Sequence, residues 1–291
     1  MVQQLSLTSS VPENQFRTVR ITLRALTGLR PEPLARHTII LKPKFPFTPE
    51  QSAGKVSQVD SYRIRMVRVW EMESTSDHMD VSDDQFLLGE SISDRSSEST
   101  RNESIWTMQL SDIPAGGNRP VSIQNIYEAT VYKTDDIIGY MDEFGYMPEI
   151  EFWTKGYRYY YNDIIIEVFR LYVRSKDGSS DRKPVSDDDT TEKKEELDEL
   201  NNNDDADAGK DEMMDVDKPQ HLIKIALLDK SCRYQVKCFV NVSKLNDLDS
   251  VAKGVKELEM LKKELGGMID LHVPDRTYMD SRLNSRIASK R

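Results

Sequence analysis

The stretch WTMQLSDIPAGGNRPVSIQ, residues 106–124, contains a glycine pair beside a basic residue in AGGNR, and such a loop could hold a phosphate group. A P-loop ends in Gly-Lys-Ser/Thr before a helix, and a dinucleotide site needs Gly-x-Gly-x-x-Gly between a strand and a helix. Here extended sequence both precedes and follows the glycines, so no helix N-terminus is available to face an anion. Glycine and asparagine tolerate the positive φ of a reversing chain. We therefore predict a loop between two strands.

Three glutamates form a second candidate for chemistry. Glu149 and Glu151 are two residues apart in extended sequence, which places both carboxylates on one face, and Glu167 lies on a later strand. A barrel lined with paired glutamates and cations could hold a divalent ion and a polyphosphate, as a metal-dependent triphosphate hydrolase does. That family carries Glu-x-Glu-x-Lys, but here Trp153 takes the lysine position and Lys155 comes two residues late. We interpret these residues as charges on a solvated sheet face, with a polyphosphate or RNA triphosphatase as the alternative.

Alternating tyrosines form a third candidate. Tyr157, Tyr159 and Tyr161 share one face of a predicted strand, with Arg158 between them. Aromatic side chains on strands can stack on bases, but tyrosine stripes also serve as half-buried packing or as protein interfaces. The sequence pI of about 5.1 argues against nucleic acid as the partner. We predict a contribution to a protein interface and no direct binding of nucleic acid.

The charge of the chain is unevenly distributed. The formal net charge of the 291 residues is -10, and two segments carry more than all of it. Residues 177–218 contain 17 acidic and 6 basic residues, and residues 71–104 contain 10 acidic and 2 basic residues. Segments of this composition cannot bury enough apolar surface to offset the entropy of ordering them. We predict two disordered acidic insertions in a basic folded body. We interpret them as solvated spacers, and the alternative is that they fold back on that body and compete with a basic partner.

Nothing in the composition indicates a membrane, a secretory route or a metal centre. No stretch approaches the 18 or so apolar residues of a membrane span, and the N-terminus lacks the basic and apolar regions of a signal peptide. Cys232 and Cys238 lie six residues apart in strand-like sequence, about 20 Å, which is too far for a disulfide. The histidines have no zinc-ligand spacing. We expect an intracellular protein without a cofactor.

Two helices should flank the strands, and residues 135–144 could form a third, short helix. Pro12 and Glu13 suit a helix start, and Gly28 and Pro31 suit its end. Apolar residues at steps of three and four place one buried face on this helix, formed by Phe16, Val19, Leu23 and Leu26. Another face carries an arginine stripe, Arg17, Arg20 and Arg24, which is a candidate surface for an acidic partner. A second helix, over residues 247–265, ends at a glycine pair.

The remaining elements are predicted strands. Residues 2–7 read as a short edge strand, and residues 145–173 as a three-stranded meander with turns at Gly156 and at Asn162-Asp163. Residues 221–229 and 234–244 should form another hairpin. Many sequential strands without βαβ alternation favour an antiparallel sheet, which closes to remove its edges. We predict a mainly β fold with a few helices (α+β): one antiparallel β-barrel-like domain over residues 1–291, with helices packed outside and a polar tail at 283–291.

Several segments together resemble one family. They are MVQQLSL at the start, WTMQLSDIPAGGNRPVSIQNIYEATV and GYMPEIEFWTKGYRYYY in the middle, and LKKELGGMIDLHVPDRTYMDSR near the end. They are similar to fungal Mediator subunit 18 of the head module, and LSDIPAGGNRPVSIQ and VPDRTYMDSR are the most specific pieces. The two acidic insertions match nothing in that family.

The resemblance implies a fold and a set of partners. It implies an antiparallel β-barrel related to the triphosphatase tunnel fold, with no catalysis. It also implies a heterodimer with Mediator subunit 20, a tether formed by a helix of subunit 8, contacts with other head-module subunits and RNA polymerase II, and a nuclear location. Our residue-level prediction for the partner interface remains the two faces defined above: Arg17, Arg20 and Arg24, and Tyr157, Tyr159 and Tyr161.

Overall fold

The computed structural model describes most of the predicted folded body. The described residues are 1–46, 51–52, 55–56, 61–69, 91–93, 105–132, 134, 136–175, 222–243 and 247–283. Insertion 177–218 lies outside them, as does the tail after residue 283. Within the predicted insertion 71–104, the short strand β6 (Ser91–Ser93) is described and pairs with β11 (Leu222–Leu227).

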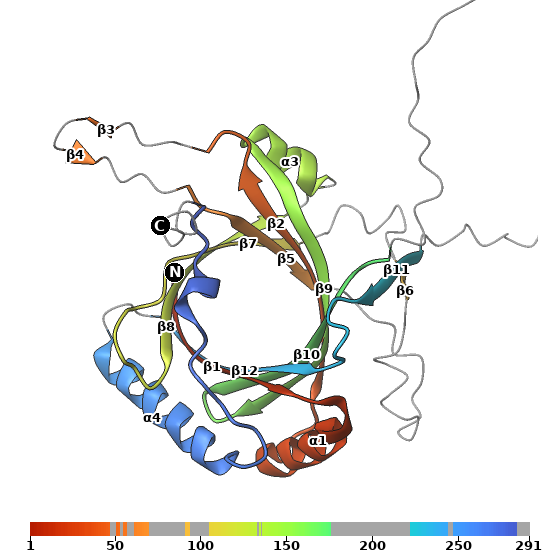
Figure 1. Ribbon diagram of the computed structural model, residues 1–291, viewed down its shortest axis with the longest axis vertical. Coiled ribbons are helices and arrows are strands. Elements are labelled where there is room, and N and C mark those ends of the chain that lie inside the picture. The colour runs from red at the N-terminus through yellow and green to blue at the C-terminus, as the bar shows by residue number, and fades with distance from the viewer. Residues whose placement is uncertain are drawn as a thin grey trace, which may run out of the picture.

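The core of the fold is a closed barrel of eight antiparallel strands (Figure 1). In barrel order the strands are β12 (Tyr234–Val242), β1 (Val2–Val11), β8 (Ser122–Tyr132), β7 (Ile105–Ser111), β5 (Ile64–Val69), β2 (Glu32–Pro43), β9 (Tyr146–Tyr161) and β10 (Ile164–Arg174). The pairing of β10 with β12 closes the ring. A separate two-stranded sheet joins β3 (Gln51–Ser52) to β4 (Lys55–Val56). The predicted α+β barrel class is confirmed.

In the described part of the chain, three α-helices lie on the outside of the barrel (Figure 1). Helix α1 (Glu13–Thr27) begins after Pro12 and ends at Gly28, whose φ of 67° is the left-handed conformation that glycine adopts readily. Helix α4 (Leu248–Glu264) begins at Asp247, whose carboxylate accepts a hydrogen bond from the Ser250 amide, and it ends before Gly266 and Gly267. Both helices match the predicted ranges. Helix α3 is short (Ile137–Glu143). None of these helices is long and apolar enough to cross a membrane, within the residues that the structure describes.

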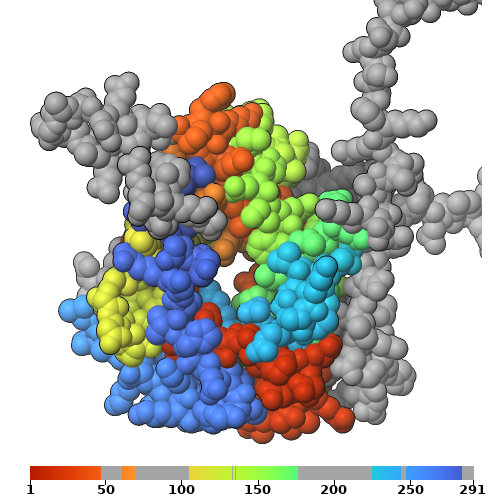
Figure 2. Space-filling model, in the orientation of Figure 1, coloured from red at the N-terminus to blue at the C-terminus, as the bar shows by residue number. Residues whose placement is uncertain are grey.

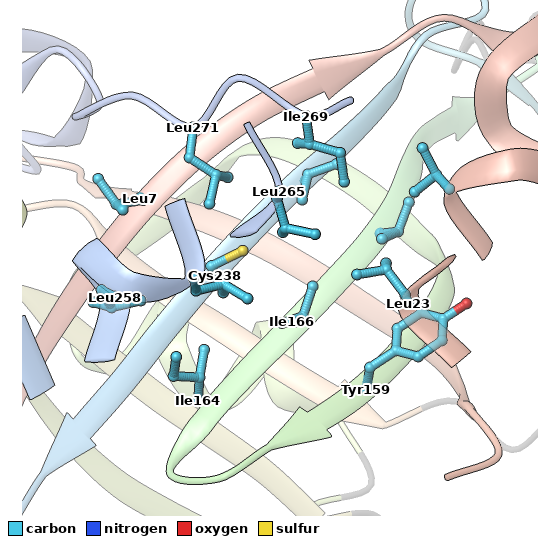
Figure 3. Packing of buried hydrophobic residues seen from close by; sticks show 14 of the residues in the cluster. Leu7, Leu23, Tyr159, Ile164, Ile166, Cys238, Leu258, Leu265, Ile269 and Leu271 are labelled. Carbon is cyan, nitrogen blue, oxygen red and sulfur yellow. The ribbon is translucent and has the colours of Figure 1, made fainter. Parts of the chain in front are cut away.

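The main hydrophobic core lies between α1, α4 and the outer wall of the barrel (Figure 3). Leu23 from α1 and Leu258 from α4 are fully buried against strand residues such as Leu7, Ile166 and Cys238. A second cluster packs α3 against β2, β5 and β7. Because side chains alternate along a strand, residues that neighbour these buried ones point into the lumen of the barrel. The outer wall is therefore apolar under the helices, and the polar residues of the same strands face inward.

Strand β9 corrects the predicted meander. It runs from Tyr146 to Tyr161 as one strand, so Gly156 lies in its middle and is no turn, and residues 145–173 form two strands rather than three. A β-carbon at Gly156 would collide with the Val168 carbonyl oxygen and lie 2.6 Å from the Phe169 Cα. Glycine is needed here because β10 passes too close for any side chain. The turn at Asn162-Asp163 is confirmed, with Asn162 at a φ of 52°.

Two further strand predictions were wrong. Strand β1 is no edge strand, since it pairs with β12 on one side and β8 on the other. Strands β11 and β12 do not form a hairpin with each other. Instead β10 pairs with β12 through residues 165–169 and with β11 through residues 172–174. In the closed barrel β12 pairs with β10 on one side and with β1 on the other, and β11 lies outside the ring.

Candidate functional site

The predicted tyrosine face and arginine stripe meet in the structure, because α1 packs on the outer wall beside β9. Tyr157 and Tyr159 are 5% and 2% exposed, and the Arg20 guanidinium lies over the Tyr157 ring, 4.7 Å from its centroid. Burial raises the pKa of the Tyr159 hydroxyl. This corrects the expectation of an exposed aromatic face: Tyr157 and Tyr159 are core residues of this chain, and only Tyr161 keeps part of its surface.

The arginine stripe keeps two exposed members. Arg17 and Arg24 are exposed on the outer side of α1, and Arg20 is half-buried by its contact with the tyrosine ring. Tyr161 is half-buried at the edge of the same region. The surface that remains for a partner therefore consists of Arg17 and Arg24 on α1, while the Tyr161 hydroxyl donates to Glu264 Oε1 of α4 at 3.5 Å.

The glutamates that suggested a metal-dependent hydrolase do not converge. Glu151 faces outward and accepts a hydrogen bond from His37 Nε2 at 2.9 Å, which lowers the pKa of its carboxyl group. Glu149 is paired with Arg63 at 2.6 Å, next to a break in the β2–β9 register. Glu167 faces the lumen, on the other side of the wall from Glu151. In the described part of the chain, no group of three His, Cys, Asp or Glu side chains could hold a metal ion.

The lumen contains a cluster of charges around Glu167, whose side chain is 2% exposed. Arg36 Nη2 donates to its Oε2 at 2.6 Å, and Arg158 Nη2 donates to its Oε1 at 2.8 Å. Burial alone would raise the pKa of Glu167, but the two arginines hold it below its ordinary value. The cluster is thus a buried carboxylate held between two guanidinium groups that keep some contact with solvent.

Two more cations share the lumen with this cluster. The Lys237 ammonium donates to Gln4 Oε1 at 2.7 Å and lies over the Phe239 ring. Burial, together with the nearby Arg65 and Arg36, lowers the pKa of Lys237 to about 8, although Glu167 acts in the opposite direction. Desolvation by the surrounding barrel wall and the charge of Arg36 also lower the pKa of Arg65, although its side chain keeps access to water. The centre of the lumen is therefore crowded with positive charge.

The glycine segment at residues 112–121 is a loop between strands, as predicted, with β7 before it and β8 after it. Gly117 adopts a φ of 94°, and Arg119 Nε donates to the Gly116 carbonyl oxygen at 3.0 Å. No helix begins after the glycines, so the loop offers no helix N-terminus to a phosphate. The phosphate-loop alternative is excluded.

A C-terminal strap, residues 272–283, packs on this loop and crosses one mouth of the barrel (Figure 1). It pairs with β1 through Thr8 and His272, and Arg276 Nε then donates to the Pro114 carbonyl oxygen at 2.8 Å. Beyond that point, Gln124 Nε2 donates to the Met279 carbonyl oxygen at 3.0 Å. The two most specific sequence segments, LSDIPAGGNRPVSIQ and VPDRTYMDSR, thus hold each other in place.

Beside the strap, the outer wall carries an apolar groove that sequence reasoning missed. Its volume is about 480 Å³, and it is lined by Tyr62, Ile64, Met108, Leu110, Asp112, Tyr127, Glu128 and Ala129. We call it the β5–β7–β8 groove. No helix of the described part covers it, and Tyr127 is 40% exposed. The alternation of Trp106, Met108 and Leu110 in β7 marked an apolar face, but only the placement of the helices shows which part of that face stays uncovered.

Together these features define a class of protein. The chain forms a closed β-barrel with outer helices and an exposed apolar groove, and basic side chains hold its carboxylates on opposite sides of the barrel wall. A barrel of this kind is a scaffold for binding other proteins. The chain belongs to the Mediator subunit 18 family, since the model of the family described as Med18 protein matches residues 3–282.

Individual relatives agree with this assignment. The chain is 25% identical to Mediator of RNA polymerase II transcription subunit 18 of Candida albicans, covering 97% of this chain and 99% of the relative. It is 26% identical to the subunit of the same name from Yarrowia lipolytica, covering 97% and 100%. A chain in the structure of the Schizosaccharomyces pombe Mediator head module has the same fold, with a TM-score of 0.57 and 16% identity over 92% of this chain and 97% of that one.

Proposed function

We propose that this chain is a non-catalytic structural subunit of the Mediator head module, acting in the nucleus as a coactivator that links regulators to initiation by RNA polymerase II. The observation that carries the proposal is membership of the Mediator subunit 18 family across residues 3–282. The barrel adds a physical reason. The carboxylates of Glu149, Glu151 and Glu167 are paired with basic side chains, and an apolar groove and an arginine stripe stay uncovered, as a subunit that contacts several neighbours requires.

The β5–β7–β8 groove is the proposed seat of an amphipathic helix from another head-module subunit, and the helix of Mediator subunit 8 is the candidate. Helices bind in apolar grooves through side chains spaced three and four residues apart. Met108 and Leu110 provide an apolar floor, and the Asp112 carboxylate accepts a hydrogen bond from the Tyr127 hydroxyl at 3.2 Å on the rim. Because the Asp112 carboxylate lies on this rim, we expect a basic residue along the edge of the docked helix.

The arginine stripe is a separate proposed surface, for Mediator subunit 20. Arg17 and Arg24 are exposed and lie on a rigid helix anchored by Phe16 and Leu23. Arginine is enriched at interface positions that contribute strongly to binding. Acidic residues are the expected counterparts on the partner. This surface does not overlap the groove, so the two contacts can form at the same time.

Replacing Leu110 with aspartate should weaken binding of the subunit 8 helix at least tenfold, because a charged group would then lie on the apolar floor. Binding of subunit 20 should stay unchanged. The measurement is titration of the purified chain with each subunit. Leu248→Asp is the matched control, since Leu248 is an apolar side chain that is 78% exposed outside the groove.

The double variant Arg17→Ala/Arg24→Ala completes this experiment. It should weaken binding of subunit 20 and leave binding of the subunit 8 helix intact. Arg20 is kept because its contact with Tyr157 stabilises the fold. Unchanged affinity of Leu110→Asp for the subunit 8 helix would remove the groove from the proposal, and unchanged affinity of the arginine variant for subunit 20 would remove the stripe.

A further inference from the structure

The end of the strap lies at the edge of the β5–β7–β8 groove. The Leu283 amide donates to the Ser61 carbonyl oxygen at 2.8 Å, and Arg282 pairs with Tyr62 in an isolated antiparallel bridge. Tyr62 is also one of the residues that line the groove. The chain therefore leaves the strap directly beside this groove.

The point of exit is fixed by contacts of the strap. The Ser281 hydroxyl donates to the carbonyl oxygen of Ser111, the last residue of β7, and Arg282 Nη2 pairs with Asp280 Oδ2 at 2.8 Å. Figure 2 shows the strap in blue beside the yellow atoms of the segment around the β7–β8 loop. Because the strap is held at these points, the residues that follow it stay tethered next to the groove.

The tail after the strap, residues 284–291, is long enough to cross the groove. These eight residues have the sequence NSRIASKR and lie outside the described residues. An extended chain advances about 3.3 Å per residue and neighbouring strands are about 4.8 Å apart, so about four residues span the distance from β5 to β8. The strap runs antiparallel to the start of β5, so the tail must reverse to enter the groove. Asn284 and Ser285 are residue types that favour such a turn.

The composition of the tail matches the chemistry of the groove. The tail has one large apolar residue, Ile287, and no acidic residue. Its basic residues are Arg286, Lys290 and Arg291. The groove has an apolar floor, which includes Met108 and Leu110, and a carboxylate at its rim, Asp112. An isoleucine next to an arginine complements this arrangement of floor and rim.

Asp112 has no cation of its own in the described part of the chain. Its carboxylate accepts a hydrogen bond from the Tyr127 hydroxyl at 3.2 Å, and no described basic side chain pairs with it. The three carboxylates discussed above, Glu149, Glu151 and Glu167, each have a basic partner. A basic residue of the tail would give Asp112 the partner that those carboxylates already have.

We propose that the tail occupies the β5–β7–β8 groove in the chain free of partners, with Ile287 on the apolar floor and Arg286 beside Asp112. The inference rests on the proposed function, because it concerns the groove assigned there to the helix of subunit 8. Tail and helix present the same apolar and basic chemistry, so they exclude each other. A tail tethered this closely reaches an effective concentration of about 1 mM, so a weak contact is enough to make it an internal competitor of the helix.

Titration of a fluorescently labelled NSRIASKR peptide with the purified chain tests this contact in the absence of other subunits. The peptide should bind saturably to a chain that ends at Leu283, because no attached tail competes for its groove. Binding to the full chain should be weaker by about threefold or more, since the attached tail competes there. The shortened chain should fold, because every strap contact described above involves residues up to 283.

Two matched pairs of variants locate the contact. In the shortened chain, Leu110→Asp should weaken binding of the peptide about tenfold, and Leu248→Asp, outside the groove, should leave it unchanged. An Ile287→Asp peptide should bind about tenfold more weakly than the unaltered peptide, and a Ser289→Ala peptide should bind equally well. Because the second pair changes the peptide alone, misfolding of the chain cannot explain a loss of binding.

Deleting the tail should also tighten binding of the subunit 8 helix by the factor measured with the peptide, because tail and helix compete for one groove. The absence of saturable binding up to millimolar peptide, equal affinity of the full and shortened chains, or equal affinity of the two variant peptides would overturn the proposal. Helix binding that the deletion leaves unchanged would do the same. Peptide binding without helix binding would instead remove the helix from the groove and leave the tail there, so the two proposals can fail separately.

Discussion

Replacing Gly156 with alanine should destabilise the barrel by at least about 3 kcal/mol, because the new methyl group would collide with the backbone of β10. The Val168 carbonyl oxygen and the Phe169 Cα occupy the space that a β-carbon needs. Both belong to backbone that is hydrogen-bonded within a closed ring, so neither can move aside cheaply. The change in the midpoint of urea unfolding, together with the yield of soluble protein, measures the effect.

Gly116→Ala is the matched control for Gly156. Gly116 lies in the loop between β7 and β8, and the nearest atom to an added β-carbon is the flexible end of Arg276 at 3.4 Å. We expect a change within about 0.5 kcal/mol, typical of a surface substitution. A Gly156→Ala protein as stable as the Gly116→Ala protein would show that β9 and β10 do not approach as described.

Glu167→Gln should cost about 2–4 kcal/mol of unfolding free energy at neutral pH, because it leaves the cations of the lumen without their carboxylate. The lower part of the range is expected, since Arg36 and Arg158 are 27% and 30% exposed and can be partly hydrated. Glutamine keeps the shape of the side chain, so the loss reports the charge. Urea unfolding of both proteins from pH 7 to pH 3 is the measurement.

The lowered pKa of Glu167 predicts in which direction its contribution to stability changes with pH. The pKa of Glu167 is lower in the folded chain than its ordinary value, so the stabilisation is present above the unfolded pKa and is lost as the pH falls through the folded pKa. The difference in stability between the unaltered chain and the Glu167→Gln variant should therefore shrink in acid. Lys253→Met is the control, because its ion pair with Asp163 is exposed to water and should contribute little to stability. A difference that stays constant with pH would contradict the ion-pair account.

The helices of this protein could be read from the sequence because their signals are local. Apolar residues at steps of three and four, with Gly28 after the first helix and Gly266-Gly267 after the last, placed both within a residue or two. The barrel class followed from the number of sequential strands. These features depend on neighbours in the chain, which a sequence displays directly.

The errors arose where the deciding contact is distant in sequence. Gly156 has the composition of a turn, yet its role is set by the approach of β10, which the local sequence does not show. The tyrosines alternate as predicted, but whether their face is a surface or a core depends on where α1 packs. Glu149 and Glu151 looked paired, and a break in the β2–β9 register gives them different partners.

For the candidate site too, features set by neighbours in the chain could be predicted, and features set by distant contacts could not. The arginine stripe could be predicted because α1 is a regular helix with a readable pattern. The β5–β7–β8 groove and the lumen cluster combine residues from three or more strands, and their existence depends on ring closure. A sheet that stayed open would expose Arg65 and Glu167 to bulk water, and neither a groove of this shape nor a confined cation cluster would form.

Purification of the tagged full chain at native abundance from its own cells, with quantification of the co-purifying proteins, tests the central claim most directly. We predict Mediator subunits 20 and 8 in near-equal amount to the chain, with other head-module subunits and RNA polymerase II in smaller amounts. A chain that purifies alone, or in stoichiometric amount with proteins outside Mediator, would contradict the account of this barrel as a structural subunit of the head module.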